Sequence, residues 1–99
     1  MNQITVDQLA ALASPVLIDV REPDEFAGGH APGAVSVPMS QLGERLDEIP
    51  TDVPVHIICH SGGRSARVTE ALAGRGVSAI DVAGGTSAWI ASGREVVHP

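Results

Sequence analysis

An α/β fold is the fold class that this sequence predicts: a central parallel sheet of about five short strands, with helices on both faces. Three observations support it. Short apolar runs alternate with amphipathic stretches, the turns between them are short, and no repeat or low-complexity tract interrupts the pattern. A length of 99 residues suits one domain, so we expect residues 1–99 to form a single domain.

The predicted strands are short runs of branched apolar residues, a composition typical of buried strands. Each run is four or five residues long, and the tail adds a candidate for a further strand. The four runs are residues 16–20, 34–37, 55–59 and 78–82, and the tail candidate is residues 95–97.

The predicted helices lie between these runs. Thr5 and Gln8 form a capping box that opens the first, and Pro15 disfavours helical backbone at the residue before it. Glycines close the later helices. The expected ranges are 5–13, a short helix and turn over 22–29, 40–49 with Ser40 as its cap, 64–73, and a helix between Gly84-Gly85 and Gly93.

Composition and charge exclude several classes of function. The chain has 12 acidic and 6 basic residues and a net charge of -6, which is unsuited to binding nucleic acid or an anionic membrane. No segment approaches the roughly 20 apolar residues that span a bilayer, and the first residues lack the basic start of a signal peptide. The only cysteine, Cys59, cannot form an internal disulfide, so we expect a cytoplasmic protein with a reduced thiol.

Chemistry is concentrated in the segment Cys59-His60-Ser61-Gly62-Gly63-Arg64-Ser65, which leaves a predicted strand and enters a predicted helix. The glycines allow the backbone to turn its N–H groups inward, where they and the helix N-terminus can hold an anion. The same dipoles favour thiolate over thiol, and Arg64 adds positive charge. Ser61 and Ser65 offer hydroxyl donors. We therefore expect Cys59 to be the nucleophile, with residues 60–65 binding the substrate.

A lone cysteine at the end of an apolar strand is more often an inert core residue. The glycine-rich turn into a helix that follows Cys59 is the more specific signal, and it favours the reactive interpretation.

The loop resembles the active-site loop of rhodanese domains, often written Cys-Arg-Ser-Gly-x-Arg-Ser. Three further segments are similar to motifs of that family and occur in the expected order. They are Ile18-Asp19-Val20-Arg21-Glu22-Pro23-Asp24-Glu25-Phe26, Gly29-His30-Ala31-Pro32-Gly33-Ala34 and Val82-Ala83-Gly84-Gly85-Thr86-Ser87-Ala88-Trp89.

The resemblance implies a rhodanese-like fold and sulfurtransferase chemistry without a cofactor. Cys59 would take the outer sulfur of thiosulfate or another sulfane donor as a persulfide, and then pass it to cyanide or a thiol. The implied partners are a small anionic sulfur donor and a thiol or protein acceptor. A second hypothesis is a sulfur-relay or protein-interaction module that receives its persulfide from another protein.

Loop length separates these hypotheses from a phosphatase or an arsenate reductase. Phosphatase relatives of this fold have five residues between Cys and Arg, whereas Cys59 and Arg64 have four between them. The tighter loop favours a sulfane sulfur over a tetrahedral phosphate. His60 stands where many members of the family carry arginine, and Glu22, Asp24 and Glu25 make the neighbouring segment acidic. We therefore expect weak attraction for thiosulfate.

The remaining candidate residues have mainly structural interpretations. The resemblance implies that His30 fixes its loop by hydrogen bonds. His56 lies within a strand, and His98 lies in the tail, where we expect no role. One cysteine and scattered histidines provide no zinc-ligand spacing. Further residues with structural interpretations are Asp19 and Arg21, as an ion pair or as a support for the Cys59 loop; Trp89, as packing or as a partner site; and Glu44, Asp47 and Glu48, as a solvated face.

Overall fold

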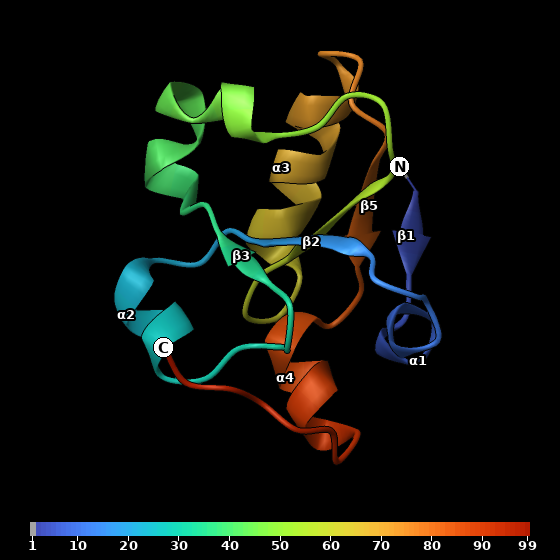
Figure 1. Ribbon diagram of the computed structural model, residues 1–99, viewed down its shortest axis with the longest axis vertical. Coiled ribbons are helices and arrows are strands. Elements are labelled where there is room, and N and C mark those ends of the chain that lie inside the picture. The colour runs from blue at the N-terminus through green and yellow to red at the C-terminus, as the bar shows by residue number, and fades with distance from the viewer. Residues whose placement is uncertain (1) are drawn as a thin grey trace.

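Within residues 2–99, which the computed structural model describes, five parallel strands form one sheet in the order β1-β5-β4-β2-β3 (Figure 1). Its middle strand is β4, which pairs with β2 on one side and β5 on the other. The predicted α/β class and parallel sheet are confirmed. The strands are β1 (Gln3–Ile4), β2 (Val16–Asp19), β3 (Val35–Ser36), β4 (Val55–Ile58) and β5 (Ala79–Val82).

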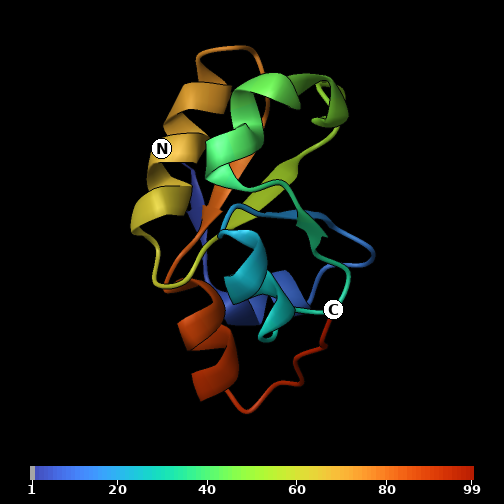
Figure 2. The ribbon, with the colours of Figure 1, turned by 90° about the vertical axis from the view of Figure 1, so that its left-hand side faces the viewer.

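The helices cover both faces of the sheet, as predicted (Figures 1 and 2). The α-helices α3 and α4 begin and end close to their expected positions, whereas α1 ends three residues before Ala13. The helical segments are α1 (Val6–Ala10), α2 (Pro23–Ala27), the 3₁₀ segments η1 (Met39–Glu44) and η2 (Leu46–Glu48), α3 (Gly63–Ala73) and α4 (Gly85–Ala91).

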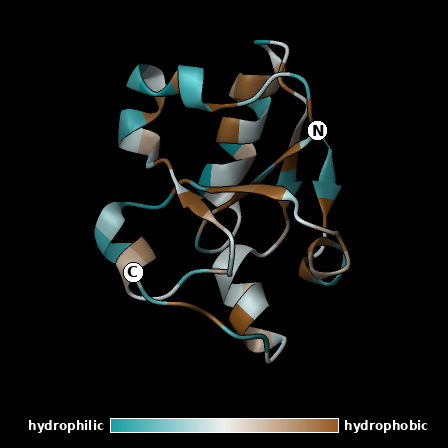
Figure 3. Cartoon of the chain, in the orientation of Figure 1, coloured by the Kyte–Doolittle hydropathy of each residue, from teal (hydrophilic) through white to brown (hydrophobic). Residues whose placement is uncertain are grey.

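Two apolar clusters lie on opposite faces of the sheet. Because side chains alternate along a strand, Ile57 points to one face and Ile58 to the other. The Ile57 face packs against α3 through Val68 and Leu72. The Ile58 face packs against α1 and α4, where Trp89 joins the cluster. In Figure 3, β2, which lies inside the sheet, is coloured as hydrophobic, whereas α2, which has no buried residue, is largely hydrophilic.

The first strand, β1, was not predicted from the sequence. The prediction of a strand at residues 95–97 is wrong. β1 is only two residues long, so it offers no alternation to recognise, yet it completes the sheet by pairing Gln3 with Asp81. In the tail, Val97 makes a single antiparallel bridge with His30. The C-terminal chain returns to the turn before β3 without joining the sheet.

The helix expected at residues 40–49 is also wrong in type. The segment is divided into η1 and η2, and Arg45 between them leaves helical geometry at φ -117° and ψ 20°. Gly43 lowers helix propensity in the middle of the segment, which favours the tighter 3₁₀ turns. Leu42 and Leu46 still pack against the core, so the predicted apolar face is retained.

The parallel pairing brings the carboxyl ends of the strands to one edge, where such sheets bind ligands. The register sets Asp19 at the end of β2 beside Ile58 at the end of β4. Cys59 follows Ile58 directly, at the middle of this edge. Among the described helices, none is long and apolar enough to cross a membrane.

Candidate active site

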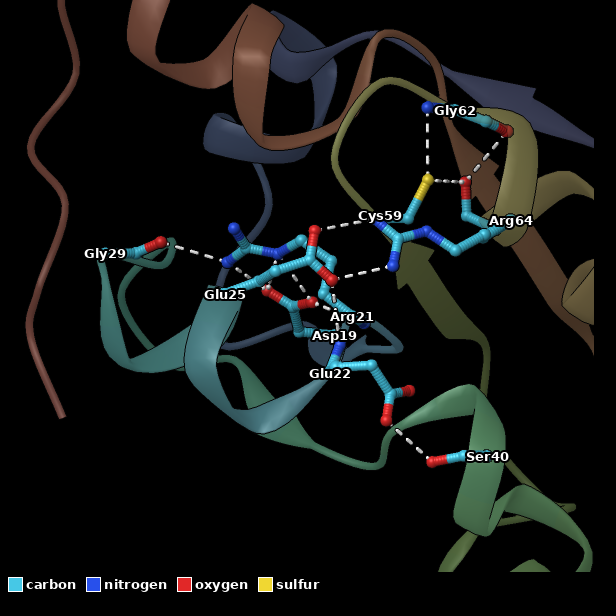
Figure 4. Close-up of polar contacts among 10 residues, drawn as sticks. Asp19, Arg21, Glu22, Glu25, Gly29, Ser40, Cys59, Gly62 and Arg64 are labelled. Atoms are coloured by element: carbon cyan, nitrogen blue, oxygen red, sulfur yellow. Dashed lines mark hydrogen bonds and ion pairs between the residues drawn. The ribbon is translucent and has the colours of Figure 1, made fainter.

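Cys59 lies at the base of the loop between β4 and α3 and is 1% exposed. The loop above it turns at Gly62, whose φ of 117° is a conformation that side-chain-bearing residues rarely adopt. This turn aims the Gly62 N–H at the sulfur, with 3.1 Å between N and Sγ (Figure 4). Ser65, in the first turn of α3, brings its Oγ to 3.3 Å from the same Sγ.

Two opposing effects act on the Cys59 thiol. Burial raises its pKa, because the thiolate loses solvation. Hydrogen bonding to the Ser65 side chain and to the backbone of Ser65, Gly62 and Ser61 lowers it, and the net result is a pKa below the ordinary value for a thiol. The predicted donors therefore favour the thiolate, which is the nucleophilic form.

The two glycines of the loop have different roles. Gly62 supplies the positive φ, whereas Gly63 begins α3, and a Cβ there would meet no atom within 4 Å. The predicted turn of the backbone is therefore made at Gly62, and Gly63 already belongs to α3. One left-handed residue is enough, because α3 starts immediately after it.

A second pair of glycines supports the loop from behind. Gly84 and Gly85 both have positive φ, and they start α4 so that the Thr86 N–H donates to the Cys59 carbonyl at 2.8 Å. The Ser87 N–H likewise donates to the His60 carbonyl at 2.9 Å. The Gly-Gly turn was predicted from the sequence, but its contact with the cysteine loop was not. Its signal was two adjacent glycines at the end of a strand that neighbours β4.

The guanidinium of Arg64 is paired with a carboxylate. It donates to both oxygens of Glu25, at 2.7 and 2.8 Å, so its charge is largely balanced (Figure 4). This pair lowers the pKa of Glu25 from 4.5 to about 2, chiefly through the hydrogen bond from Arg64. The sequence does not identify Glu25 as the partner of Arg64, although Glu22, Asp24 and Glu25 make that segment acidic.

We expect this ion pair to make stability depend on pH in the acid range. A lowered carboxyl pKa contributes stability above about pH 4.5, and the contribution is lost as the pH falls toward about 2. The two side chains are 35% and 33% exposed, so solvent screening limits the contribution to about 1 kcal/mol. Urea unfolding at pH 6 and pH 3 should show a larger loss for the wild type than for Glu25→Gln. An equal loss in the two proteins would contradict the assignment.

A scan against protein-family models matches residues 5–92 to the rhodanese-like domain. The chain belongs to the rhodanese-like family. This confirms the predicted family, and it supports sulfur transfer as the general chemistry of the chain.

Relatives of this rhodanese-like chain agree with the assignment. It is 47% identical to an uncharacterized protein of Bacillus subtilis over 90% of its own length and 72% of the relative. It is 37% identical to a protein of Allochromatium vinosum named a sulfurtransferase, over 93% of its own length and 87% of the relative. The crystal structure of a rhodanese-related protein from Thermoplasma volcanium superposes with a TM-score of 0.92 at 32% identity, over the whole of both chains.

The other loop residues of the rhodanese-like domain differ in exposure. His60 and Ser61 are exposed at the rim of the loop, whereas Ser65 is fully buried below it. The Nε2 of His60 lies 3.4 Å from the Oγ of Ser87 on α4. The loop therefore gathers the residues that the sequence singled out, with Ser65 below and His60 above the opening.

Asp19 and Arg21 form a buried ion pair at the end of β2. The Arg21 Nη2 lies 2.8 Å from the Asp19 Oδ2, and it also donates to the Gly29 carbonyl at 2.9 Å. Both side chains are almost fully buried. This is the structural interpretation of the two that the sequence left open, because the pair ties β2 to the turn before His30.

Three further residues have the structural roles expected of them. His30 stacks on Phe26, with 3.6 Å between ring centroids, and its Nδ1 lies 2.9 Å from the Phe26 carbonyl oxygen. His56 is buried, with its Nδ1 3.0 Å from the Val16 carbonyl oxygen. Trp89 packs in the core and donates its indole N–H to the Glu95 carbonyl. No cluster of His, Cys, Asp and Glu side chains suited to a metal ion occurs in the part of the chain described.

Proposed function

We propose that Cys59 carries a sulfane sulfur between a donor and an acceptor as a persulfide. The single observation that supports this most is the position of its Sγ, which faces the Gly62 N–H at 3.1 Å beneath a glycine-shaped loop. That donor suits a thiolate before the reaction and a terminal anionic sulfur after it. The family supplies the general chemistry, and Cys59 is the only cysteine of the chain.

The reaction runs in two halves. The Cys59 thiolate attacks the outer sulfur of the donor with its own electron pair, and a new S–S bond forms on Sγ. The bond between that sulfur and the donor breaks, and its electron pair leaves with sulfite or a thiolate. In the second half, cyanide or a thiolate attacks the outer sulfur of the persulfide, and Cys59 departs as a thiolate. The enzyme is thereby restored without net oxidation, and a cytoplasmic location would keep the thiol reduced between turnovers.

The pairing of Arg64 favours a persulfide donor over thiosulfate. Thiosulfate is a dianion and needs positive charge, but Glu25 balances Arg64 and His60 replaces the arginine common in the family. The net charge of -6 opposes a dianion further. These features favour the sulfur-relay alternative, in which a persulfide on a small thiol or on a partner protein supplies the sulfur.

A comparison of donors tests the proposal. We expect thiocyanate formation from cyanide to be slow with thiosulfate and faster with cysteamine persulfide, whose ammonium group offsets the charge of its sulfur, and to vanish in Cys59→Ser. In Glu25→Gln, Arg64 is released from its ionic partner, so we expect the thiosulfate rate to rise severalfold relative to the persulfide rate. Glu22→Gln is the matched control, because it removes a nearby charge that accepts a hydrogen bond from Ser40 and should leave the ratio unchanged.

Two results would contradict the proposal. Equal rates of thiocyanate formation from the two donors in the wild type would contradict the claim that the pairing of Arg64 disfavours thiosulfate. Release of phosphate from an aryl phosphate, dependent on Cys59, would restore the phosphatase hypothesis that the four-residue spacing disfavours.

A further inference from the structure

A small cavity lies at the amino ends of the strands, on the opposite side of the sheet from the Cys59 loop. It has a volume of about 280 Å³ and opens between the segment that joins α1 to β2 and the start of β4. The register explains this position, because the first residues of β2 and β4 lie side by side. Its walls are mainly apolar and are formed by Leu12, Ala13, Pro15, Val16, Val53 and Pro54, with Ser14 and His56 as the polar members.

His56 is the buried polar side chain of this lining. It is 6% exposed, and its Nδ1 lies 3.0 Å from the Val16 carbonyl oxygen. A carbonyl oxygen can only accept a hydrogen bond, so Nδ1 carries a proton and donates it. In the neutral ring the other nitrogen, Nε2, is then an acceptor with a free lone pair.

The Nε2 of His56 faces the cavity. Within residues 2–99 the ring makes its hydrogen bond through Nδ1, and none through Nε2. Nε2 is not sealed in the core either, because the buried side-chain atoms that lack a partner in this part of the chain are the hydroxyl oxygens of Thr69 and Thr86. Since the ring lines the cavity, Nε2 is open on the cavity side.

The lining favours a neutral and mainly apolar occupant. It contains no charged side chain among the described residues, so an ion would lose its hydration without gaining a counter-ion. A well-bound water molecule has two to four polar partners, and the apolar walls offer few beyond Nε2. Leu12 and Val53 are still 44% and 39% exposed, so an apolar molecule would cover hydrophobic surface that now faces water.

The backbone at the rim of the cavity is strained. Ser14 has a φ of 47°, and between residues 2 and 99 it is the one residue other than glycine with a positive φ. The left-handed conformation costs free energy, and such strain is found at ligand-binding segments among other functional sites. Here the turn at Ser14 brings Leu12 and Pro15, on either side of it, to the same cavity.

We propose that this cavity binds a neutral, mainly apolar molecule of one or two rings, whose hydroxyl or N–H group donates a hydrogen bond to the Nε2 of His56. Simple phenols and indoles have this chemistry. The volume of about 280 Å³ lies at the lower end of the range for small-molecule sites, roughly 300–1,000 Å³, and this limits the size of the ligand. Because the cavity and Cys59 lie at opposite ends of β4, the ligand is neither the sulfur donor nor the acceptor.

Phenol and toluene are matched probes, because they have nearly the same shape and only phenol carries a donor. In ¹H–¹⁵N spectra at pH 8 we expect phenol to shift the signals of Leu12, Ala13 and Val53, with a dissociation constant of about a millimolar. Long-range spectra of the imidazole should show the Nε2 signal of His56 moving toward that of a protonated nitrogen, while the Nδ1 signal stays in place. Toluene should leave the Nε2 signal unmoved.

Two variants locate the phenol. Ala13→Trp fills the cavity from an exposed position and should abolish these shifts, whereas Ala71→Trp is the matched control at an exposed position of α3 outside the cavity. His56→Phe keeps a ring but removes Nε2, so the ratio of phenol to toluene affinity should fall severalfold. If His56→Phe does not fold, the Nε2 signal of the wild type and the Ala13 variant decide the matter.

Three results would overturn the proposal: no shift at several times the expected dissociation constant, an Nε2 signal that saturating phenol leaves unmoved, or equal binding of phenol by Ala13→Trp and the wild type. The inference is independent of sulfur transfer, so Cys59→Ser should bind phenol as tightly as the wild type. Loss of binding in Cys59→Ser would place the phenol at the cysteine loop and contradict the assignment to the His56 cavity.

Discussion

Replacement of Gly85 by alanine should destabilise the protein by roughly 3 kcal/mol or more and displace the Cys59 loop. A Cβ at this position would lie 2.5 Å from the Cys59 carbonyl oxygen and 2.8 Å from the backbone of His60. These are backbone atoms in the loop itself, so neither side can move without disturbing the site. The φ of 59° adds the strain of a left-handed alanine.

Denaturant unfolding of Gly85→Ala beside Gly93→Ala separates the two causes. Gly93 also has a positive φ, 81°, but a Cβ there would meet no atom within 4 Å. The Gly93 variant should therefore lose only about 1 kcal/mol from the conformation. Equal losses in the two variants would show that contact with the loop contributes nothing. Slower alkylation of Cys59 in the Gly85 variant alone would locate the damage at the loop.

Replacement of Asp19 by alanine should cost about 3–5 kcal/mol, because it leaves the Arg21 guanidinium buried without its anion. Of its contacts with Asp19 and with the Gly29 carbonyl, the guanidinium would keep only the second. The double variant Asp19→Ala, Arg21→Met removes both charges and should recover a large part of the loss. Urea unfolding measures the three proteins. A double variant as unstable as the single one would contradict the claim that the unpaired charge is the cause.

The sequence predicted those parts of the fold that depend on local pattern. The capping box at Thr5 is present, with the Gln8 N–H donating to the Thr5 Oγ1 and the Gln8 Oε1 accepting from the Thr5 N–H. Glycines and branched runs located α3, α4, β2, β4 and β5, because each is long enough to show a period or a boundary, and the apolar run 34–37 located the two-residue β3. β1 has two residues and depends on its pairing with β5, which no local pattern reveals.

The candidate site, too, could be predicted from the sequence only in part. The loop from Cys59 to Ser65 could be recognised because its residues are consecutive, whereas its partners come from distant segments. Glu25 and Asp81 meet Arg64 and Ser65 across 39 and 16 residues of sequence. Such contacts are set by strand order, so the pairing of Arg64 and the carboxylate behind Ser65 emerge only from the fold.

The most direct measurement of the central claim is the intact mass of the reduced protein after exposure to a sulfane donor, followed by mapping of the modified peptide. Wild type should gain one sulfur atom on the peptide that contains Cys59, Cys59→Ser should gain none, and cyanide should return the wild type to its original mass. Absence of any gain with thiosulfate, polysulfide and glutathione persulfide, in a protein whose Cys59 still reacts with iodoacetamide, would contradict sulfur transfer through this residue.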